Sequence, residues 1–402
     1  MDGSRFIPDF RLQIDGAPVP AELRASVSSV TFVSGLEGAD RLEITLVNDG
    51  LRWLDQSLFA LDTPVSLQLG YADTGTQQVF VGQIVGFGAA FPSGAAQTVT
   101  VTAQDARYRL AQGNKVRWFA IPIPHVGNFP LPDVATAPLV ALENLLVPLI
   151  DPVGIALSVL LGGVEVVVAL ITDPGSAQKL IRKQANESDY DFLTKIAKEN
   201  GWEMVIDHDG PLGGHKLHFF SPLGRLDADV DLAYGASLID FTPRISNVGQ
   251  IFSVSGYVWV PPIKMVFNIV LGFDWDRMAL TLAIYPGGVA SGPSKTSAST
   301  DLIDDPLTLA TAPRKLVSEL IPKLNKRLTA TGTTLGDPGI IAGKVLRITG
   351  VGVQFGGLWR VTEATHTLDS GGYRTHFELR KEIWFGSIPA STQGAIPVRV
   401  SF

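Results

Sequence analysis

The chain has 402 residues, of which 46% are hydrophobic and 18% are charged, a balance typical of a folded protein with room for two or three domains. Its formal net charge is −7 and its lysines and arginines never run longer than two residues, which excludes nucleic-acid binding through a concentrated basic stripe. The absence of cysteine excludes disulfides, thiolate metal sites and cysteine nucleophiles.

Residues 5–117 predict a first β module. Residues 1–10 lack the basic-then-apolar pattern of a signal peptide, so we do not expect Sec export. Apolar and polar residues alternate in the stretches 10–14, 42–46, 65–71 and 99–101. Turn-forming residues follow or separate these stretches at Asp15-Gly16, 35–38, 48–50 and 73–75. Because alternation buries one face of a strand, the pattern favours an antiparallel barrel or sandwich.

Residues 118–174 form an apolar, proline-rich insertion, which we expect to be helical in part. Residues 121–138 are expected to be extended or looped, whereas residues 139–173 are strongly apolar. The stretch 152–171 has the roughly 20 residues that a membrane-spanning helix needs, but it contains Glu165 and the helix-weakening pair Gly162-Gly163. We expect a pair of buried or interface helices, and membrane contact is the alternative.

A small α/β unit is expected over residues 175–232. Ser188 is placed to cap a helix, with Asp191 as its capping-box partner, and Gly201 is placed to end that helix. Alternating residues then predict a strand at 202–206, and a second strand is predicted at 216–220 after a turn.

Residues 233–386 predict a second β module. Strands are expected near 238–241 and 251–254 and within 345–379, where residues 365–377 form a hairpin. A helix is expected at 313–330, because leucines recur there at every fourth residue.

Several shorter features complete the C-terminal half. Pro322 is expected to kink the helix. Residues 290–300 and Asp304-Asp305 are expected to be surface loops. Residues 387–402 are expected to be a C-terminal tail, in which Val398 and Val400 add an edge strand.

The order of these segments resembles the late control protein D family of phage tails and the N-terminal hub part of VgrG-type spikes. The resemblance spans nearly the whole chain. It rests on three groups of residues: Gly38-Ala39-Asp40 with 42–46, 53–55 and 65–71; Ala185-Asn186-Glu187-Ser188-Asp189-Tyr190-Asp191-Phe192-Leu193; and 333–338 with 342–343, 365–368 and 371–373. The chain departs from the family in its longer, more apolar insertion and in the lack of a repetitive β-helical needle before Phe402.

This resemblance implies a homotrimeric baseplate hub in which each subunit carries two tail-tube-like antiparallel β-barrels. Three subunits would then form a pseudo-sixfold ring that joins the hexameric tail tube to a trimeric spike. The implied partners are the tail tube protein, a separate spike or tip protein and the tape measure protein, with DNA or cargo passing through the lumen. The implied location is the tail tip of a virion or injection particle, assembled in the bacterial cytoplasm.

The histidines do not predict a metal site. His215 and His218 are spaced by three on a predicted strand and point to opposite faces, which does not suit one metal ion. Across the last hairpin His366 is expected to lie opposite Thr375, so His366 and His376 also face opposite sides. We expect surface or packing roles for all of them.

The other candidate motifs also lack residues that catalysis or nucleotide binding would need. Glu187, Asp189 and Asp191 cluster at a predicted helix start, where the helix dipole stabilises negative charge, so they indicate capping rather than acid–base catalysis. Residues 339–344 resemble a P-loop fragment without its leading glycine and its Ser/Thr. We therefore expect no catalytic residue, no cofactor, no metal and no enzyme activity. The alternatives are a tail-associated cell-wall hydrolase and a membrane-active effector acting through residues 139–173.

Overall fold

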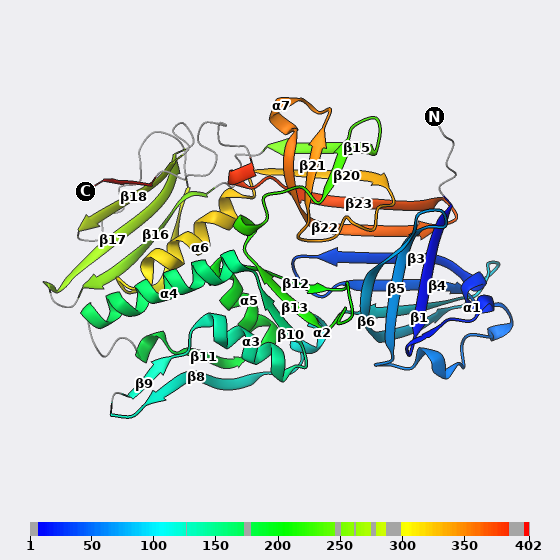
Figure 1. Ribbon diagram of the computed structural model, residues 1–402, viewed down its shortest axis with the longest axis horizontal. Helices are drawn as coiled ribbons and strands as arrows, with labels where there is room; N and C mark the ends of the chain where they lie inside the picture. Colours follow the sequence, from blue (N-terminus) through cyan, green and yellow to red (C-terminus); the bar gives the residue numbers. More distant parts are fainter. Residues whose placement is uncertain are drawn as a thin grey trace.

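The computed structural model describes residues 7–125, 127–172, 178–245, 251–260, 263–274, 279–286, 299–385 and 398–401 (Figure 1). Most strand pairs are antiparallel and the helices are few, which confirms a mainly β fold. Of the loop expected at residues 290–300, residues 290–298 lie outside the described residues, and residues 299–300 begin a strand and are not in a loop. Tail residues 387–397 also lie outside the described residues.

The largest sheet draws strands from both halves of the chain. Its N-terminal strands are β1 Pro8–Ile14, β2 Ala17–Pro18, β3 Val27–Gly35, β4 Arg41–Val47, β5 Pro64–Tyr71, β6 Gly75–Ala90 and β7 Thr98–Gln104. Its C-terminal strands are β14 Val230–Ala233, β15 Leu238–Ile245, β20 Leu328–Leu335, β21 Val345–Thr349, β22 Gly357–Asp369 and β23 Gly372–Arg380. The main path runs β15-β20-β23-β22-β3-β4-β7-β6-β5-β1-β2, with β14 and β21 attached beside β22.

The two β modules are joined edge to edge within this sheet. Strand β3 pairs antiparallel with β22, from Val30 opposite Leu368 to Gly35 opposite Glu363. No linker separates the modules at this seam, because backbone hydrogen bonds continue across it.

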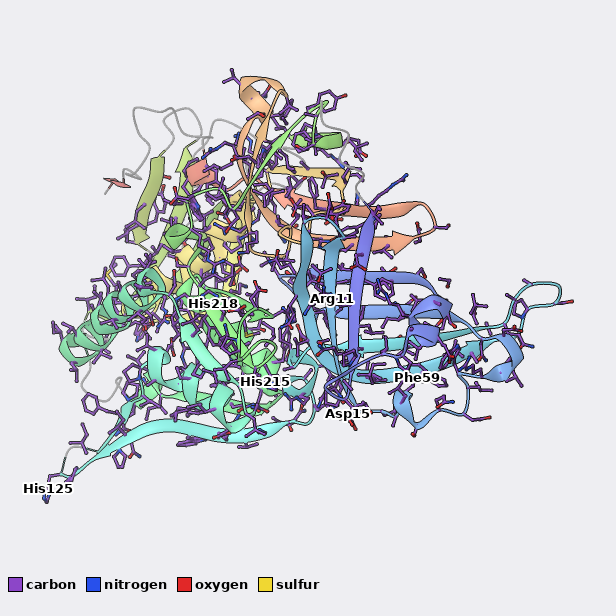
Figure 2. All side chains as sticks on the ribbon, turned by 45° about the vertical axis from the view of Figure 1, so that its right-hand side comes forward. Arg11, Asp15, Phe59, His125, His215 and His218 are labelled. Atoms are coloured by element: carbon purple, nitrogen blue, oxygen red, sulfur yellow. The ribbon has the colours of Figure 1, made fainter. Side chains whose placement is uncertain are left out.

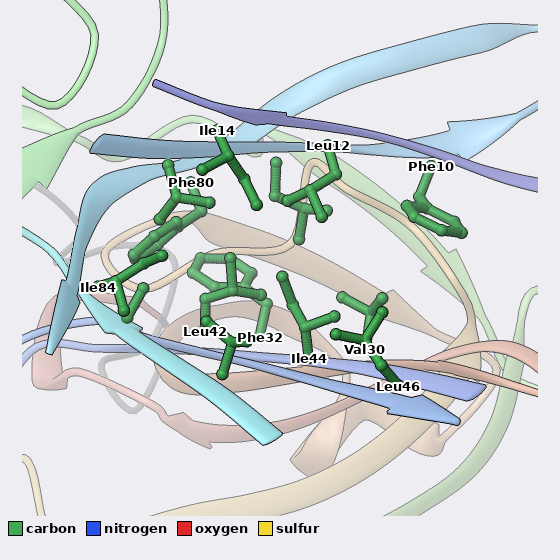
Figure 3. Packing of buried hydrophobic residues seen from close by; sticks show 14 of the residues in the cluster. Phe10, Leu12, Ile14, Val30, Phe32, Leu42, Ile44, Leu46, Phe80 and Ile84 are labelled. Atoms are coloured by element: carbon green, nitrogen blue, oxygen red, sulfur yellow. The ribbon is translucent and has the colours of Figure 1, made fainter. Parts of the chain in front are cut away.

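The N-terminal part of the sheet folds over its own core. Figure 3 shows Leu12 and Ile14 of β1 facing Phe32 of β3 and Leu42 of β4 across the interior. These side chains alternate along each strand with more exposed ones, as the period-two pattern predicts. The Asp15-Gly16 turn is also confirmed, since both residues have positive φ and connect β1 to β2.

Residues 115–220 form a middle module in which the insertion and the α/β unit share sheets and a core. Its strands are β8 Lys115–Ile123, β9 Gly127–Pro130, β10 Val147–Ile150, β11 Arg182–Glu187, β12 Glu203–Asp207 and β13 Lys216–Phe220. Its helices are α3 Asp133–Glu143, α4 Pro152–Thr172 and α5 Asp189–Asn200. Strand β8 pairs with both β9 and β11, and β13 pairs with both β10 and β12.

The structure confirms one part of the expectations for the insertion and corrects others. Residues 121–123 and 127–130 are extended, as one expected alternative had it, and belong to the β8–β9 hairpin with His125 at its projecting tip (Figure 2), whereas residues 133–138 begin helix α3. Prolines are compatible with this hairpin, because Pro130 lies in the edge strand β9 and Pro122 lies in β8 beyond Phe119, where β8 no longer pairs with β11. Of the two alternatives expected for the helices, buried or at an interface, the second helix α4 does not fit the first: it runs unbroken through Gly162 and Gly163 with most of its apolar side chains exposed in the single chain.

A separate five-stranded sheet packs against helix α6 Ala312–Leu324. Its strands are β16 Ile251–Val260, β17 Met265–Asp274, β18 Ala279–Pro286, β19 Ser299–Leu307 and β24 Val398–Ser401. The prediction of an edge strand at Val398 and Val400 is confirmed by β24. Asp304-Asp305 lie within β19 and not in a loop.

The helix predicted at 313–330 is too long. Leucines 316, 320 and 324 are buried on α6, but Leu328 begins strand β20. Asn325 accepts a hydrogen bond from the backbone N–H of Ile383, which ties the chain beyond the helix to the segment after β23. The regular leucine spacing therefore spans a helix and a strand.

Candidate functional site

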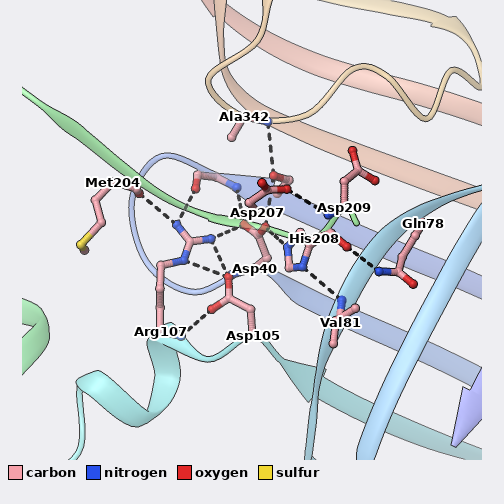
Figure 4. Close-up of polar contacts among 12 residues, drawn as sticks. Asp40, Gln78, Val81, Asp105, Arg107, Met204, Asp207, His208, Asp209 and Ala342 are labelled. Carbon is pink, nitrogen blue, oxygen red and sulfur yellow. Dashed lines mark hydrogen bonds and ion pairs between the residues drawn. The ribbon is translucent and has the colours of Figure 1, made fainter. Parts of the chain in front are cut away.

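A buried ionic junction lies where the N-terminal, middle and C-terminal modules meet (Figure 4). Asp40 lies between β3 and β4, Asp105 follows β7, and Arg107 begins the short helix α2 Arg107–Leu110. His208 follows β12 of the middle module, and Ala342 lies in the loop before β21 of the C-terminal module.

Arg107 is the centre of the junction. Its Nη2 donates to Asp40 Oδ1 at 2.5 Å and its Nε donates to Asp105 Oδ2 at 2.9 Å. Its Nη1 donates to the backbone oxygen of Gly35 in the N-terminal module and to that of Met204 in the middle module. Burial opposes the charge of Arg107, but the two carboxylates outweigh it and raise the pKa of the guanidinium.

Asp40 is ionised in this surrounding. Burial alone would raise the pKa of its carboxyl, but the charge of Arg107 and the hydrogen bond from His208 hold that pKa below its usual range. A second oxygen, Oδ2, also accepts from the Ser34 hydroxyl, and Ser34 Oγ accepts from the N–H of Ala342 at 3.2 Å. The carboxylate thus connects to the C-terminal module through one hydroxyl.

The hydrogen bonds of His208 define its tautomer. The backbone N–H of Val81 donates to His208 Nδ1 at 3.1 Å, so Nδ1 carries a lone pair. Nε2 lies 2.9 Å from Asp40 Oδ2 and carries the proton that it donates. The imidazole is therefore neutral, and it links β6 of the N-terminal module to the loop after β12.

Asp40, Asp105 and His208 are close enough together to be tested as a metal site. Their donor atoms, however, already accept from or donate to protein groups: His208 Nδ1 from Val81, and the carboxylates from Arg107. A cationic guanidinium occupies the position between the carboxylates that an ion would need. The residues fit a structural junction and do not fit a cation.

A second ionic cluster connects four helices to strand β11. Asp133 of α3 accepts two hydrogen bonds from Arg182 of β11, both at 2.9 Å, and one from Arg314 of α6 at 2.5 Å. Burial would raise the pKa of Asp133, but Arg182 and Arg314 lower it to about 2. Asn200 of α5 donates to the same carboxylate at 2.8 Å.

Glu165 extends this cluster to α4. Arg314 Nη1 donates to Glu165 Oε2 at 2.8 Å, so the only charged residue of α4 is turned toward the protein. Burial raises the pKa of Glu165 despite the opposing charge of Arg314. Most of the apolar residues of α4 consequently face outward.

The structure places the four predicted histidines in packing or surface positions. His366 lies opposite Thr375 in β23, and this register confirms the prediction. His366 is buried and His376 is exposed. His215 is exposed before β13, whereas His218 is buried within it, where burial and the charge of Arg225 lower its pKa to about 4.

The acids at the start of α5 have different roles. Ser188 Oγ accepts from the N–H of Asp191 at 3.0 Å, which confirms the predicted cap. Asp189 is buried and receives hydrogen bonds from Lys115, Asn144 and other side chains, so it belongs to an ion-pair network.

Sequence reasoning missed Asp105, Arg107 and His208. Asp105 and Arg107 come shortly after the alternating stretch 99–101, and two opposite charges close behind a predicted strand were the available signal. Nothing in the sequence connects Asp40 to His208, because the two residues are 168 positions apart.

No protein-family model matches the sequence, and no curated protein matches it. Solved structures do share its fold. The 43 kDa tail protein of prophage MuSo2 from Shewanella oneidensis has a TM-score of 0.61 at 12% identity, with 92% of this chain and 98% of that chain covered.

Two further structures are similar over most of the chain. A tail protein from Neisseria meningitidis has a TM-score of 0.57 at 10% identity, covering 94% of this chain and 97% of the other. A type VI secretion component from Escherichia coli has a TM-score of 0.51 at 11% identity, covering 92% and 76%. The chain therefore has the fold of these tail and secretion proteins.

Proposed function

We propose that the chain is a structural hub at the tip of a phage tail or related contractile injection machine, where it joins the tail tube to a spike. The shared sheet carries this proposal, because the β3–β22 pairing makes one subunit supply two β modules side by side. Three such subunits would present six modules to a hexameric tube and three identical faces to a trimeric spike. The similarity in fold to tail proteins over nearly the whole chain supports the same role.

In this proposal residues 5–117 and 233–386 are the two tube-like modules of a homotrimeric ring. The insertion 118–174 and the α/β unit 175–232 act as one body, because they share one hydrophobic core. The ring would enclose a lumen for tape measure protein, DNA or cargo. The particle would be assembled in the bacterial cytoplasm and carry the ring at its tail tip.

The copy number tests the hub. We expect the purified protein, or the protein within isolated particles, to be present as three copies in one ring. Native mass spectrometry and light scattering over a range of concentrations measure this number. A protein that stays monomeric throughout that range, and that is absent from the tail tip of imaged particles, would contradict the hub.

The carboxylates of the two ionic clusters are not arranged as the catalytic pair of a cell-wall hydrolase would be. A glycosidase needs two carboxylates facing one groove. Asp40 and Asp105 instead share Arg107, and Asp133 and Glu165 share Arg314. Incubation of the purified protein with peptidoglycan is expected to release no soluble fragments, and release would favour the hydrolase.

A further inference from the structure

Helix α4 presents an apolar face to solvent. Its outward residues are Ile155, Ala156, Val159, Leu160, Gly163, Val164, Val167, Leu170 and Ile171, which we call the outer face of α4. Leu160 is 63% exposed and Val167 is 55% exposed. A contiguous apolar surface of this kind marks an interaction site on a folded protein.

The orientation of α4 is set by its inward side. Glu165 binds Arg314, and Ser158 and Ala169 are buried. At the first turn Gly154 donates its N–H to Asp151 Oδ1 and accepts from Trp202 Nε1 at 3.1 Å. A Cβ at Gly154 would lie 2.4 Å from Asp151 Oδ1, so the helix packs closely there. These contacts hold the outer face away from the core.

The middle of the outer face has the spacing of a helix-packing seam. Ala156, Leu160, Gly163, Val167 and Leu170 follow one another at alternating steps of four and three residues. Steps of four and three keep one row of side chains facing a partner helix. The small residues Ala156 and Gly163 lie one heptad apart, and the space beyond Gly163 is open, so a second helix could approach closely there.

A lipid bilayer does not fit this face, although α4 has the length and mean hydropathy of a membrane span. Strand β10 before the helix pairs with β13, and β11 after it pairs with β8, so both ends of α4 are held in the same module. The helix therefore cannot cross a bilayer without unfolding that module. A helix lying in the membrane surface typically has a polar face rich in lysine and arginine, and α4 has neither residue.

We propose that the outer face of α4 packs against the outer face of α4 in neighbouring copies of this chain. The face is uncharged along its whole length, so it is complementary to an identical neutral face. The seam is shorter than the three to four heptads, roughly, that a coiled coil needs by itself. It therefore adds to an assembly that other surfaces also hold, and in this respect the contact rests on the proposed hub.

The absence of cysteine from the chain allows a direct test. Leu160→Cys and Val167→Cys each place one thiol in the seam, and Val353→Cys places one on the exposed helix α7 Gly352–Phe355, away from α4 (Figure 1). Under mild oxidation we expect disulfide-linked dimers from both seam variants and none from Val353→Cys. Parallel helices around one axis bring identical positions of neighbouring copies together, so disulfides should form at both residue 160 and residue 167.

A charge in the seam gives the second measurement. Leu160→Lys should weaken assembly about tenfold or more, because a lysine would be buried without a partner. A ring of three copies with unlinked seam cysteines and unchanged assembly of Leu160→Lys would overturn the α4 contact and leave the hub standing. A monomeric wild-type protein would overturn both. Binding of the wild type to neutral phosphatidylcholine vesicles that Leu160→Lys abolishes would make lipid the occupant and overturn the contact.

Discussion

His208 and His366 are both buried, and the hydrogen-bond partners of each hold its ring in one neutral tautomer. His366 Nε2 lies 2.9 Å from the backbone oxygen of Ile340, which can only accept, so Nε2 carries the proton. Nδ1 then accepts from the hydroxyl of Tyr373 or Thr375. Burial lowers the pKa of His366 to about 4, because the charged imidazolium would lose its hydration in the core.

This neutrality predicts a loss of stability in mild acid. The unfolded chain binds a proton at His366 with the usual pKa of about 6.5, whereas the folded chain does not do so until about pH 4. The free energy of unfolding should therefore fall as the pH falls from about 6.5 to 4, by up to about 1.4 kcal/mol per pH unit from this residue. His218 contributes with the same sign.

Urea denaturation at pH 7, 5.5 and 4.5 measures this effect. His366→Gln should be less stable than the wild type at pH 7 but should lose less stability on acidification. Equal slopes for the two proteins would show that His366 is not the responsible group.

The ionic junction predicts a large effect from one carboxylate. Asp40→Asn keeps the shape but removes the negative charge that accepts from Arg107 and His208, so that Arg107 keeps only Asp105 as an ionic partner. Breaking a buried ion pair in this way costs about 3–5 kcal/mol. Glu43→Gln is the control, because its pair with Arg41 is exposed and should contribute less than about 1 kcal/mol. Chemical denaturation of both variants measures the difference, and similar losses would contradict the structural role of the junction.

The sequence predicts contacts between residues that are close in the chain better than contacts between residues that are far apart in it. The hairpin turn determines that His366 faces Thr375, so their pairing follows from counting residues. The contact between Asp40 and His208 depends on how two modules dock, and no local pattern encodes it.

At the scale of single elements, α5 has the strongest local signals. Ser188 caps its first turn, and Gly201, with a φ of +65°, ends it. Both were predicted because capping needs only neighbouring residues. Helix α6 shows the limit of such patterns, since its leucine spacing continues into β20 where tertiary pairing with β15 and β23 decides the structure.

The cap predicts a modest loss on truncation. Ser188→Ala removes the acceptor for the N–H of Asp191 and should cost about 1 kcal/mol of stability. Ser188→Thr retains an acceptor and should cost less. Denaturation midpoints at constant m value give the comparison, and an equal loss in both variants would point to side-chain packing and not to the cap.

The fate of α4 was predicted only in part. Composition indicates an apolar helix. The side of the helix that faces solvent, however, is set by the ion pair of Glu165 with Arg314, which lies 149 residues further along the chain. An isolated acid in an apolar stretch was visible in the sequence, and its partner was not.

At the scale of the whole molecule, the modules are interlocked by contacts at several places. Tyr71 of the N-terminal module donates to the backbone oxygen of Gly336 at 2.8 Å, and the N–H of Gly38 donates to Tyr190 at 2.7 Å. Together with the β3–β22 pairing, these contacts favour cooperative unfolding of the two β modules.

Calorimetry should therefore record one main heat-absorption peak for the two β modules. Asp40→Asn should move that peak to lower temperature as a whole, because the junction belongs to both sides. Two resolved peaks, of which the substitution moves only one, would show that the modules fold independently.

The seam between β3 and β22 also has a mechanical consequence. A force applied along these strands loads a row of antiparallel backbone hydrogen bonds in shear, so the bonds must yield together and not one after another. Tension on one β module then reaches the other through this whole row of hydrogen bonds at once.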